Sequence, residues 1–508
     1  MTTAATEDLF RLPGGIRLPS FKAQSRDAEV VDVGVPPILR LPLRQHAGEP
    51  AEPIVSIGDR VLKGQCIASA NGDFSAPIHA SSSGVVTDIS IMPIADRRQQ
   101  EALCIVIETD GKDTIDPALK PIGNPFELTQ TELLSQIEQA GIVGLGGAAF
   151  PTIAKMRHAI ESTIDTLVLN GVECEPYISC DDALMRNHAA NILYGARILL
   201  KALDLPYCFV GVESDKPEAW EAFRSAAEID ADERLRMVRI PTVYPSGGED
   251  QLVYLMTGRE VPTGAFPSDV GALVHNVATA ASVAELAITG LPLISRIVTV
   301  TGEGVARPGN YEVRFGTPIA DVVAAAGGYT DDAKRLIMGG PMTGIALTSD
   351  ELAVTKACNC LILTGPAIQT SKEPERACIR CGECARICPV RLQPQQLFRA
   401  ASFGDNDALK PLGLVDCIEC GCCDLVCPSH IPLTHSFRKA KLTQRLETYD
   451  RERAERARER FESRQHRDEQ RESTDANSIR ALKDKASRDA IADILKRQQA
   501  KPTEESED

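Results

Sequence analysis

CIRCGECARICP at residues 378–389 and CIECGCCDLVCP at residues 417–428 are two stretches of the chain with one shared cysteine spacing. In each stretch three cysteines follow one another at three-residue intervals, and a fourth comes four residues later, just before a proline. Three thiolates at this spacing can wrap a tight loop around three corners of a metal cluster. The proline after the fourth cysteine does not continue the loop and suits the start of a helix. The fourth thiolate is therefore expected to lie away from the first three.

This spacing is the one found in bacterial two-cluster ferredoxins, in which the fourth cysteine of each run ligates the other cluster. Zinc is the competing metal, but tetrahedral zinc sites usually use two separated cysteine pairs. Cys422 falls outside the spacing and is predicted to be a packing residue. We therefore assign one [4Fe–4S] cluster to Cys378, Cys381, Cys384 and Cys427, and the other to Cys417, Cys420, Cys423 and Cys388.

The composition limits the class of protein. With 508 residues the chain is too long for a single core, so we expect several domains. The formal net charge of −16 argues against a general nucleic-acid-binding protein, because phosphates must be neutralised by cations. We find neither an apolar stretch of 18 residues nor a signal-peptide pattern at the start, and expect no membrane span. Sixteen cysteines in such a chain indicate metal ligands rather than disulfides.

The pattern of apolar runs and turn residues predicts a multidomain α/β protein. Residues 1–125 contain short strands and resemble the half-motifs of biotinyl/lipoyl-type barrels, but Lys63 does not sit at a carrier position, which favours a scaffolding role. Residues 126–291 alternate helices with strands, and residues 292–345 are typical of a small β-grasp unit. Residues 346–440 form the ferredoxin-type helical domain. Residues 441–508, with equal numbers of acidic and basic residues, are expected to be a solvated helix or a disordered tail.

A glycine-rich stretch, GLGGAAFPT at residues 144–152, superficially satisfies the dinucleotide-binding pattern G-x-G-x-x-A. A Rossmann fingerprint must follow a strand, whereas this stretch follows a helix expected over residues 133–139, so we reject the Rossmann interpretation. Glycines still let backbone N–H groups approach a phosphate. The helix expected after Pro151 would add its N-terminus and the charge of Lys155 to such a site.

A second motif, NGVECEPY at residues 170–177, follows a strand expected over residues 166–169. Ligand sites in α/β sheets lie beyond the C-terminal ends of strands. Glu173 and Glu175 alternate, so an extended chain would place them on one face, where they could serve ribityl or ribose hydroxyls or remain solvated.

These motifs occur, in the same order, in the RnfC family of the Rnf ion-translocating electron transport complex, together with YPSGGE at residues 244–249 and HNVAT at residues 275–279. The chain resembles this family from residue 12 through the second cysteine run, and it is also similar to the FMN- and NADH-binding subunit of respiratory complex I. The resemblance implies a barrel-sandwich-like β unit, a complex I flavin-subunit-like domain, an SLBB-like β-grasp insert and a domain with two [4Fe–4S] clusters.

The resemblance also implies contacts for the FMN phosphate and ribityl chain, for the flavin, and for NADH. Val172 and Gly248 replace acidic residues of the complex I subunit, which leaves Glu249 as a candidate contact. The phosphate and ribityl contacts are Gly144, Gly146, Gly147 and Lys155; the flavin contacts are Asn170, Glu173 and Asn276; and the NADH contacts are Phe150 and Glu175.

The function implied by the resemblance is that of an NADH-dependent flavo-iron-sulfur oxidoreductase subunit, of the translocase class, in which no side chain acts as a catalytic acid or base. Electrons would pass from NADH through FMN to the two clusters and on to membrane subunits, or in reverse. The expected partners are integral-membrane and flavin-bearing subunits of the same complex, with ferredoxin as a further candidate and no nucleic acid. The expected location is the cytoplasmic face of the bacterial inner membrane.

Two alternatives stay open at this point. A soluble cobalamin reductase of the propanediol-utilisation type resembles the same set of modules. A non-enzymatic electron-relay adaptor, with a degenerate flavin site, is motivated by Val172 and Gly248.

Overall fold

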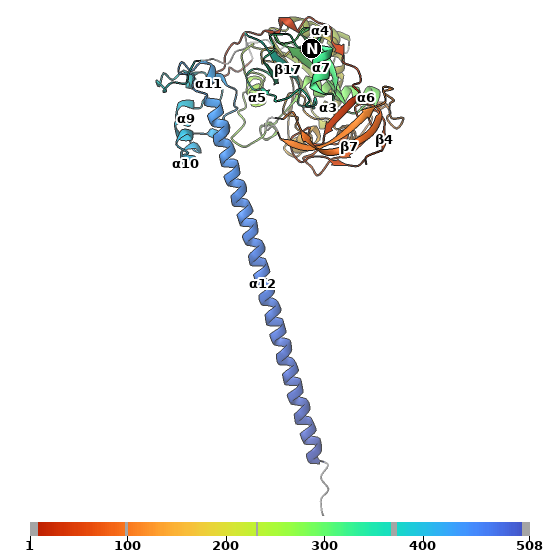
Figure 1. The fold of residues 1–508 in the computed structure, drawn as a ribbon, viewed down its shortest axis with the longest axis vertical. Helices are drawn as coiled ribbons and strands as arrows, with labels where there is room; N and C mark the ends of the chain where they lie inside the picture. The colour runs from red at the N-terminus through yellow and green to blue at the C-terminus, as the bar shows by residue number, and fades with distance from the viewer. Residues whose placement is uncertain (1–8, 97–99, 230–231, 367–372, 500–508) are drawn as a thin grey trace, which may run out of the picture. The chain divides into compact units, whose positions relative to one another are not determined.

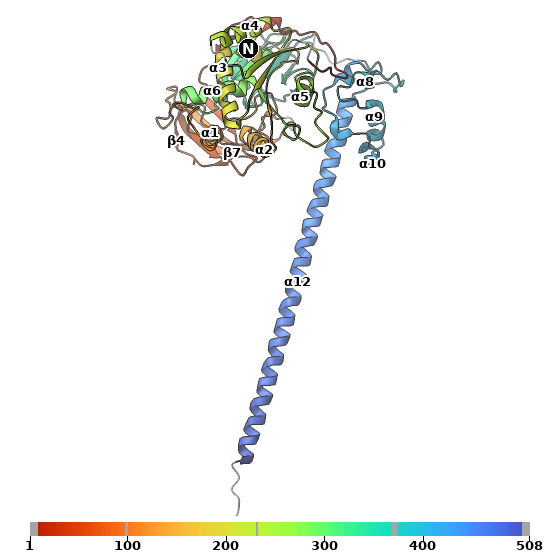
Figure 2. The same cartoon turned by 180° about the vertical axis from the view of Figure 1, so that it is seen from behind.

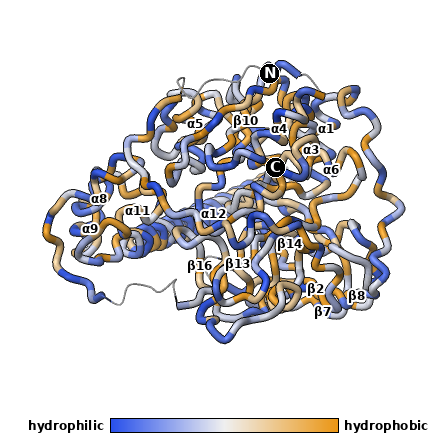
Figure 3. The backbone as a smooth tube through the Cα atoms, turned by 90° about the horizontal axis from the view of Figure 1, so that it is seen from above, coloured by the Kyte–Doolittle hydropathy of each residue, from blue (hydrophilic) through white to orange (hydrophobic). Residues whose placement is uncertain are grey.

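The computed structural model describes residues 9–96, 100–229, 232–366 and 373–499. The chain divides into two compact units, residues 1–437 and 438–508. The second unit is helical as far as Gln499 and belongs to α12 (Leu433–Gln499), which is largely hydrophilic in Figure 3. The last nine residues of the expected tail lie outside the described residues.

The first part of the chain forms a β unit of two small antiparallel sheets. Residues such as Leu39, Leu41 and Ile107 alternate with more exposed neighbours and fill its core, as expected for strands with one buried face. Lys63 forms an ion pair of 2.7 Å with Asp113, so its ammonium is held within the unit. One sheet has the order β2 (Ile38–Pro42), β8 (Glu101–Thr109), β7 (Gly84–Pro93) and β4 (Arg60–Val61), and the other has β3 (Glu52–Pro53), β5 (Cys66–Ser69) and β6 (Ile78–His79).

The next part is a parallel sheet covered by helices. Its first helix, α1 (Gln130–Gln139), begins at a capping box in which the Thr129 hydroxyl accepts from the Glu132 N–H. The strand order is β11 (Leu235–Ile240), β10 (Cys208–Glu213), β9 (Thr166–Gly171) and β12 (Ala272–Asn276). The other elements are α2 (Thr152–Glu161), α3 (Cys180–Leu203), α4 (Pro217–Ile229), α5 (Glu249–Thr257), η3 (Pro267–Val270) and α6 (Val277–Thr289), with η2 (Lys22–Gln24) from the N-terminal segment.

A third sheet contains the expected β-grasp strands and α7 (Ile319–Ala325). It also takes in one strand from the N-terminal segment and one from beyond residue 345, so it extends past the predicted 292–345 range. Both additions pair through contacts distant in sequence, which a local pattern does not reveal. The strand order is β1 (Val31–Asp32), β14 (Gly309–Arg314), β13 (Ser295–Thr301), β17 (Cys360–Thr364), β15 (Arg335–Met338) and β16 (Ile345–Ala346).

The cysteine runs lie among short helices: α8 (Glu383–Arg386), α9 (Pro394–Ser402), α10 (Asn406–Leu409), η4 (Leu414–Asp416) and α11 (Cys422–Leu425). Within the first unit, α8 to α11 gather at the end opposite to β4 and β7 (Figures 1 and 2). None of the helices in the described part of the chain combines the length and apolar character needed to cross a membrane. The multidomain α/β prediction is confirmed.

The domains of the first unit share buried contacts. One hydrophobic cluster continues from the β unit, at Leu39, into the parallel-sheet domain, at Leu133 and Leu169. Lys356, which is only 1% exposed, donates to the carbonyls of Pro77 (3.3 Å) and Gly141 (2.7 Å). Burial lowers the pKa of Lys356 to about 7.

His275 in β12 should make the unfolding free energy depend on pH. Its side chain is 3% exposed, and Nε2 has no hydrogen-bond partner among the described residues, so burial lowers its pKa to about 3. The unfolded chain therefore takes up a proton near pH 6.5 that the folded chain does not bind. We expect the stability of this domain to be highest above pH 6.5 and to fall by about 2 kcal/mol between pH 7 and pH 5 from this group.

Urea unfolding followed through Trp220, the single tryptophan, measures this dependence in the domain that contains His275. His275→Met should flatten the pH dependence by that amount. An equally steep dependence in the variant would contradict the assignment to His275.

Candidate functional site

The glycine-rich loop joins α1 to α2. The Gly144 N–H donates to the Phe150 carbonyl at 2.8 Å and closes the loop at its base, while residues 146–148 are exposed. Gly147 has φ +110°, and no described heavy atom lies within 4 Å of the point where a Cβ would stand. The loop therefore leaves its backbone open to a ligand, at a position where the conformation itself favours glycine. α2 begins directly after it, so the positive end of the helix dipole adds to an anion site, while the Thr152 N–H donates to the Ile142 carbonyl at 3.2 Å.

Lys155 and Glu249, two of the predicted contacts, are brought together. The Lys155 ammonium pairs with the Glu249 carboxylate and donates to the Val274 carbonyl at 2.7 Å. The Lys155 side chain is 23% exposed and Glu249 is 43% exposed. The ammonium is thus held between α2, α5 and β12, with its charge accessible from one side.

Asn170 and Asn276 lie side by side, at the ends of the paired strands β9 and β12. Asn170 Nδ2 donates to the Gly247 carbonyl at 2.9 Å. Asn276 caps α6, since its Oδ1 accepts from the Ala278 N–H at 2.7 Å. A Cβ on Gly146 would stand 3.6 Å from the Asn276 Cβ, so the glycine loop reaches this edge of the sheet. The predicted contacts therefore converge where ligand sites of parallel sheets lie.

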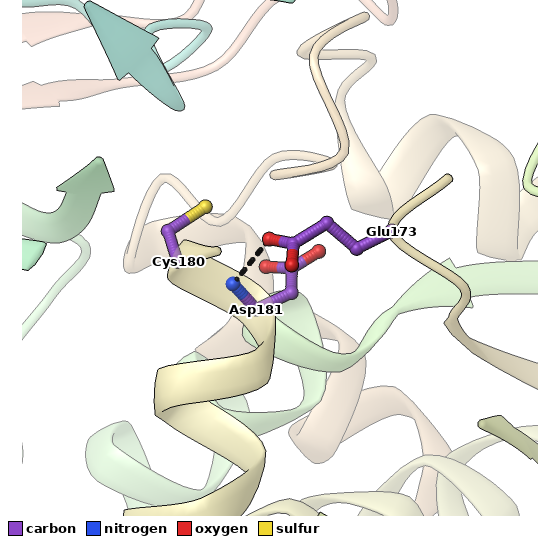
Figure 4. A group of neighbouring side chains, drawn as sticks. All are labelled: Glu173, Cys180 and Asp181. Carbon is purple, nitrogen blue, oxygen red and sulfur yellow. Dashed lines mark hydrogen bonds between the residues drawn. The ribbon is translucent and has the colours of Figure 1, made fainter. Parts of the chain in front are cut away.

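Glu173 points into a buried polar cluster that the sequence motif did not reveal. Its Oε1 accepts from the Asp181 N–H at 2.8 Å, and oxygen and sulfur atoms of Glu173, Cys180 and Asp181 lie within 4.8 Å of one another (Figure 4). Burial, and then the opposing carboxylate, raise the pKa of Glu173. Burial raises the pKa of Asp181 as well. The only signal for Asp181 was its place in an acidic first helical turn, which is also what a helix N-terminus favours.

Glu175 is held by the loop between β15 and β16 rather than facing the glycine loop. Its carboxylate accepts from the backbone N–H groups of Met342 (3.1 Å) and Thr343 (2.9 Å) and from the Thr343 hydroxyl (2.6 Å). Phe150, the other predicted NADH contact, forms an edge-to-face pair with Phe74 of the β unit, with ring centroids 6.0 Å apart. These contacts, made within the described part of the chain, direct Phe150 and Glu175 toward different neighbours and do not bring them together.

The first cysteine set surrounds one pocket. Cys378, Cys381 and Cys384 line it together with Cys427 from the second run, so four thiols converge from two segments 43 or more residues apart. Cys378 and Cys381 are exposed. This convergence of four thiols fits a cluster that takes three ligands from one run and one from the other.

The second cysteine set packs against the parallel-sheet domain. Cys388 and Cys423 are buried, and Cys417 and Cys420 are half-buried. Gly421 and Gly382 have similar positive φ values of 77° and 83° at the starts of α11 and α8. Tyr244 Oη donates to the Cys420 carbonyl at 2.8 Å. Cys422 is fully buried beside Cys420, in agreement with a packing role.

Comparisons with known proteins match four domains in order. The RnfC barrel sandwich hybrid domain matches residues 10–112, the Nuo51 FMN-binding domain 137–285, the SLBB domain 297–346 and the 4Fe-4S dicluster domain 365–431. The C subunit of the ion-translocating oxidoreductase complex of Rhodobacter capsulatus is 42% identical over 439 residues, which are 86% of this chain and 84% of the relative. The chain belongs to the RnfC family.

Other members of the RnfC family are longer. The Pseudomonas aeruginosa relative is 44% identical over 467 residues, which are 91% of this chain but 60% of its own length, and the chain also spans 60% of the Erwinia tasmaniensis relative. A chain from the crystal structure of an air-oxidized NAD+-reducing [NiFe]-hydrogenase aligns with a TM-score of 0.44 and 21% identity, covering 56% of this chain and 57% of that one.

This member of the RnfC family therefore has an FMN-binding domain and a [4Fe–4S] dicluster domain, as expected. Residues of the FMN-binding domain fit a phosphate group, and residues of the dicluster domain fit an iron-sulfur cluster. The exposed backbone of the glycine loop, α2 and Lys155 suit a phosphate, and the pocket with four thiols suits a cluster.

Proposed function

We propose that this chain is the NADH-oxidising subunit of an ion-translocating oxidoreductase complex, which passes electrons to its two clusters and on to membrane subunits, or in reverse. The observation that carries the proposal is the placement of an open glycine loop, at the edge of a parallel sheet, in the same compact unit as both cysteine sets. Bound FMN supplies the exchange between a hydride, which carries two electrons, and single electrons.

The protein's own groups would bind FMN and orient it. The N–H groups of the glycine loop and of α2 would bind the phosphate of FMN, with the Lys155 ammonium as counter-charge. Asn276, beside Gly146, would position the flavin. The Tyr244 hydroxyl holds the Cys420 loop against this domain, so the second cysteine set is the nearer acceptor in the proposal. The exposed Cys378 and Cys381 favour the first set as the one that faces the next carrier.

The proposed partners are integral-membrane and flavin-bearing subunits, with ferredoxin as a further candidate, and the proposed location is the cytoplasmic face of the inner membrane. Support comes from the name shared by the relatives, which is that of one subunit in an ion-translocating oxidoreductase complex. This name favours the proposal over a cobalamin reductase.

The decisive experiment uses the full chain reconstituted with iron, sulfide and FMN under anaerobic conditions. We expect NADH to bleach the flavin absorbance and then to reduce the clusters, with the cluster signals followed by electron paramagnetic resonance. Dithionite, which reduces clusters without a hydride site, is the control. Reduction by dithionite together with no bleaching by NADH or NADPH would favour the relay adaptor and overturn the NADH step.

A further inference from the structure

Glu173 and Asp181 form a pair of buried carboxyl groups at the inner side of the proposed flavin site. Glu173 follows the end of β9 by two residues, Asp181 lies in the first turn of α3, and their oxygens lie within 4.8 Å of one another (Figure 4). The Asn276 amide donates to Asp181 Oδ2 at 2.7 Å, and a Cβ on Gly146 would stand 3.6 Å from the Asn276 Cβ. The Asn276 side chain therefore lies between the glycine loop and the pair.

One oxygen of each carboxyl group is held by a neutral donor: the Asp181 N–H for Glu173 and the Asn276 amide for Asp181. Glu173 Oε2 is buried and has no hydrogen bond among the described residues. Its nearest cation is the Lys22 ammonium, 3.7 Å away, which donates instead to the Glu173 carbonyl. A buried carboxylate that lacks a hydrogen bond on one oxygen is costly in its ionised form. Burial favours the protonated, neutral form of the same group.

Ionisable groups from six elements or loops surround the pair, and their charges nearly cancel. The cations are Lys22, Lys216 and Arg296, and the acids are Glu213 and Asp215, with the thiols of Cys180 and Cys360 alongside. Lys216 is already committed to Glu213 and Asp215. Two further full negative charges on Glu173 and Asp181 would thus give the whole group a net negative charge, because its three cations already face two acids.

A divalent metal ion is a poorer occupant than a proton. The third donor of the group is the Cys180 thiol, and burial together with the Asp181 carboxylate raises its pKa well above the ordinary value. A metal needs the thiolate, so this cysteine would have to lose a proton that its surroundings retain. The Lys22 ammonium, 3.7 Å from Glu173 Oε2, also repels a second cation.

We propose that Glu173 and Asp181 hold one proton between them at neutral pH, and that this pair accepts the proton left in the site when NADH is oxidised. The second clause rests on the proposed function. Oxidation of one NADH gives NAD+, two electrons and one proton; the electrons reduce one cluster each, so the proton must leave separately. A pocket lined by Lys22, Glu173, Glu213 and Asp215 adjoins the pair, and Asp215 is one-third exposed, which gives the proton a route to solvent.

The shared proton can be tested on the protein without flavin. We expect the infrared spectrum at pH 7 to contain a protonated carboxyl band that shifts in deuterium oxide and fades as the pH is raised. Glu173→Gln and Asp181→Asn should each lower the pH at which the band fades, because the remaining carboxyl group is still buried but no longer faces a like charge. Asp182→Asn is the matched control, since the neighbouring Asp182 pairs with Arg26 and Arg186 and should leave the band unchanged.

Absence of the band in the folded wild type would overturn the proposal, as would a band that titrates as in the wild type in either variant, which would show that the two carboxyl groups do not share the proton. Trp220 fluorescence verifies folding of each variant, and if one variant does not fold, the other still assigns the band to the pair.

The proton-accepting role is tested with the protein loaded with FMN and iron. We expect Glu173→Gln and Asp181→Asn to slow cluster reduction after NADH addition by about 10²-fold at neutral pH, with a changed pH profile and unchanged NADH affinity. Asp182→Asn should behave as the wild type. Wild-type rates in both variants would overturn this role. Failure of the wild type to react with NADH would instead overturn the proposed function, and the infrared result would stand by itself.

Discussion

Cys427→Ala should abolish the cluster assigned to the first cysteine run, although Cys427 belongs to the second run in sequence. Its thiol lines the same pocket as Cys378, Cys381 and Cys384. Because a [4Fe–4S] cluster needs four ligands, we expect the variant to retain about four of the roughly eight irons that two clusters contain. Iron analysis after anaerobic reconstitution measures the loss.

Double variants show which cysteines share a cluster. Cys378→Ala combined with Cys427→Ala should lose no more iron than either single variant, because both residues serve one cluster. Cys423→Ala combined with Cys427→Ala should lose both clusters. Cys422→Ala, a buried thiol outside both sets, is the control and should retain both. The reverse pattern in the double variants would show that each run binds its own cluster.

Gly147→Val should prevent FMN binding while leaving both clusters intact. The change leaves open space around the new side chain but places a β-branched residue at φ +110°, where only glycine is comfortable. The loop must then move to relieve strain of about 1–2 kcal/mol or more, and its N–H groups lose their alignment. We expect at least a tenfold weaker FMN affinity, measured by quenching of FMN fluorescence.

Gly72→Val is the matched control for this change. Gly72 lies in a turn of the β unit with φ +80° and no described heavy atom within 4 Å of its Cβ position, so the variant carries a similar backbone cost away from the loop. It should bind FMN as the wild type does. Equal loss of FMN in both variants would indicate general destabilisation rather than a role for the loop.

Sequence was sufficient for features whose causes are local. The cysteine spacing, the capping box of α1 and the glycine loop after a helix all depend on residues within about a dozen positions of one another. It was insufficient where distant segments meet. Asp181 contacts Asn276 across 95 positions, and Glu175 is drawn to Thr343 across 168. No local pattern encodes which of these partners a side chain will face, so the buried pair was missed and Glu175 was expected at the ligand.

The sheets show the same difference between features with local causes and features that depend on distant segments. Strands β13, β14 and β15 all lie within the range 292–345, which the sequence predicted as a β-grasp unit. β1 and β17 join the same sheet from far along the chain, and their pairing depends on the whole fold.

Lys356 shows how tightly the successive modules of this protein depend on one another. Its ammonium, supplied by the segment before β17, is solvated by carbonyl groups of the β unit and of the parallel-sheet domain instead of by water. Excising either module would remove one of the two carbonyl acceptors of this ammonium and would uncover the hydrophobic cluster that both modules share. The β unit and the parallel-sheet domain occupy separate ranges of the sequence, but these shared contacts make them one folding unit.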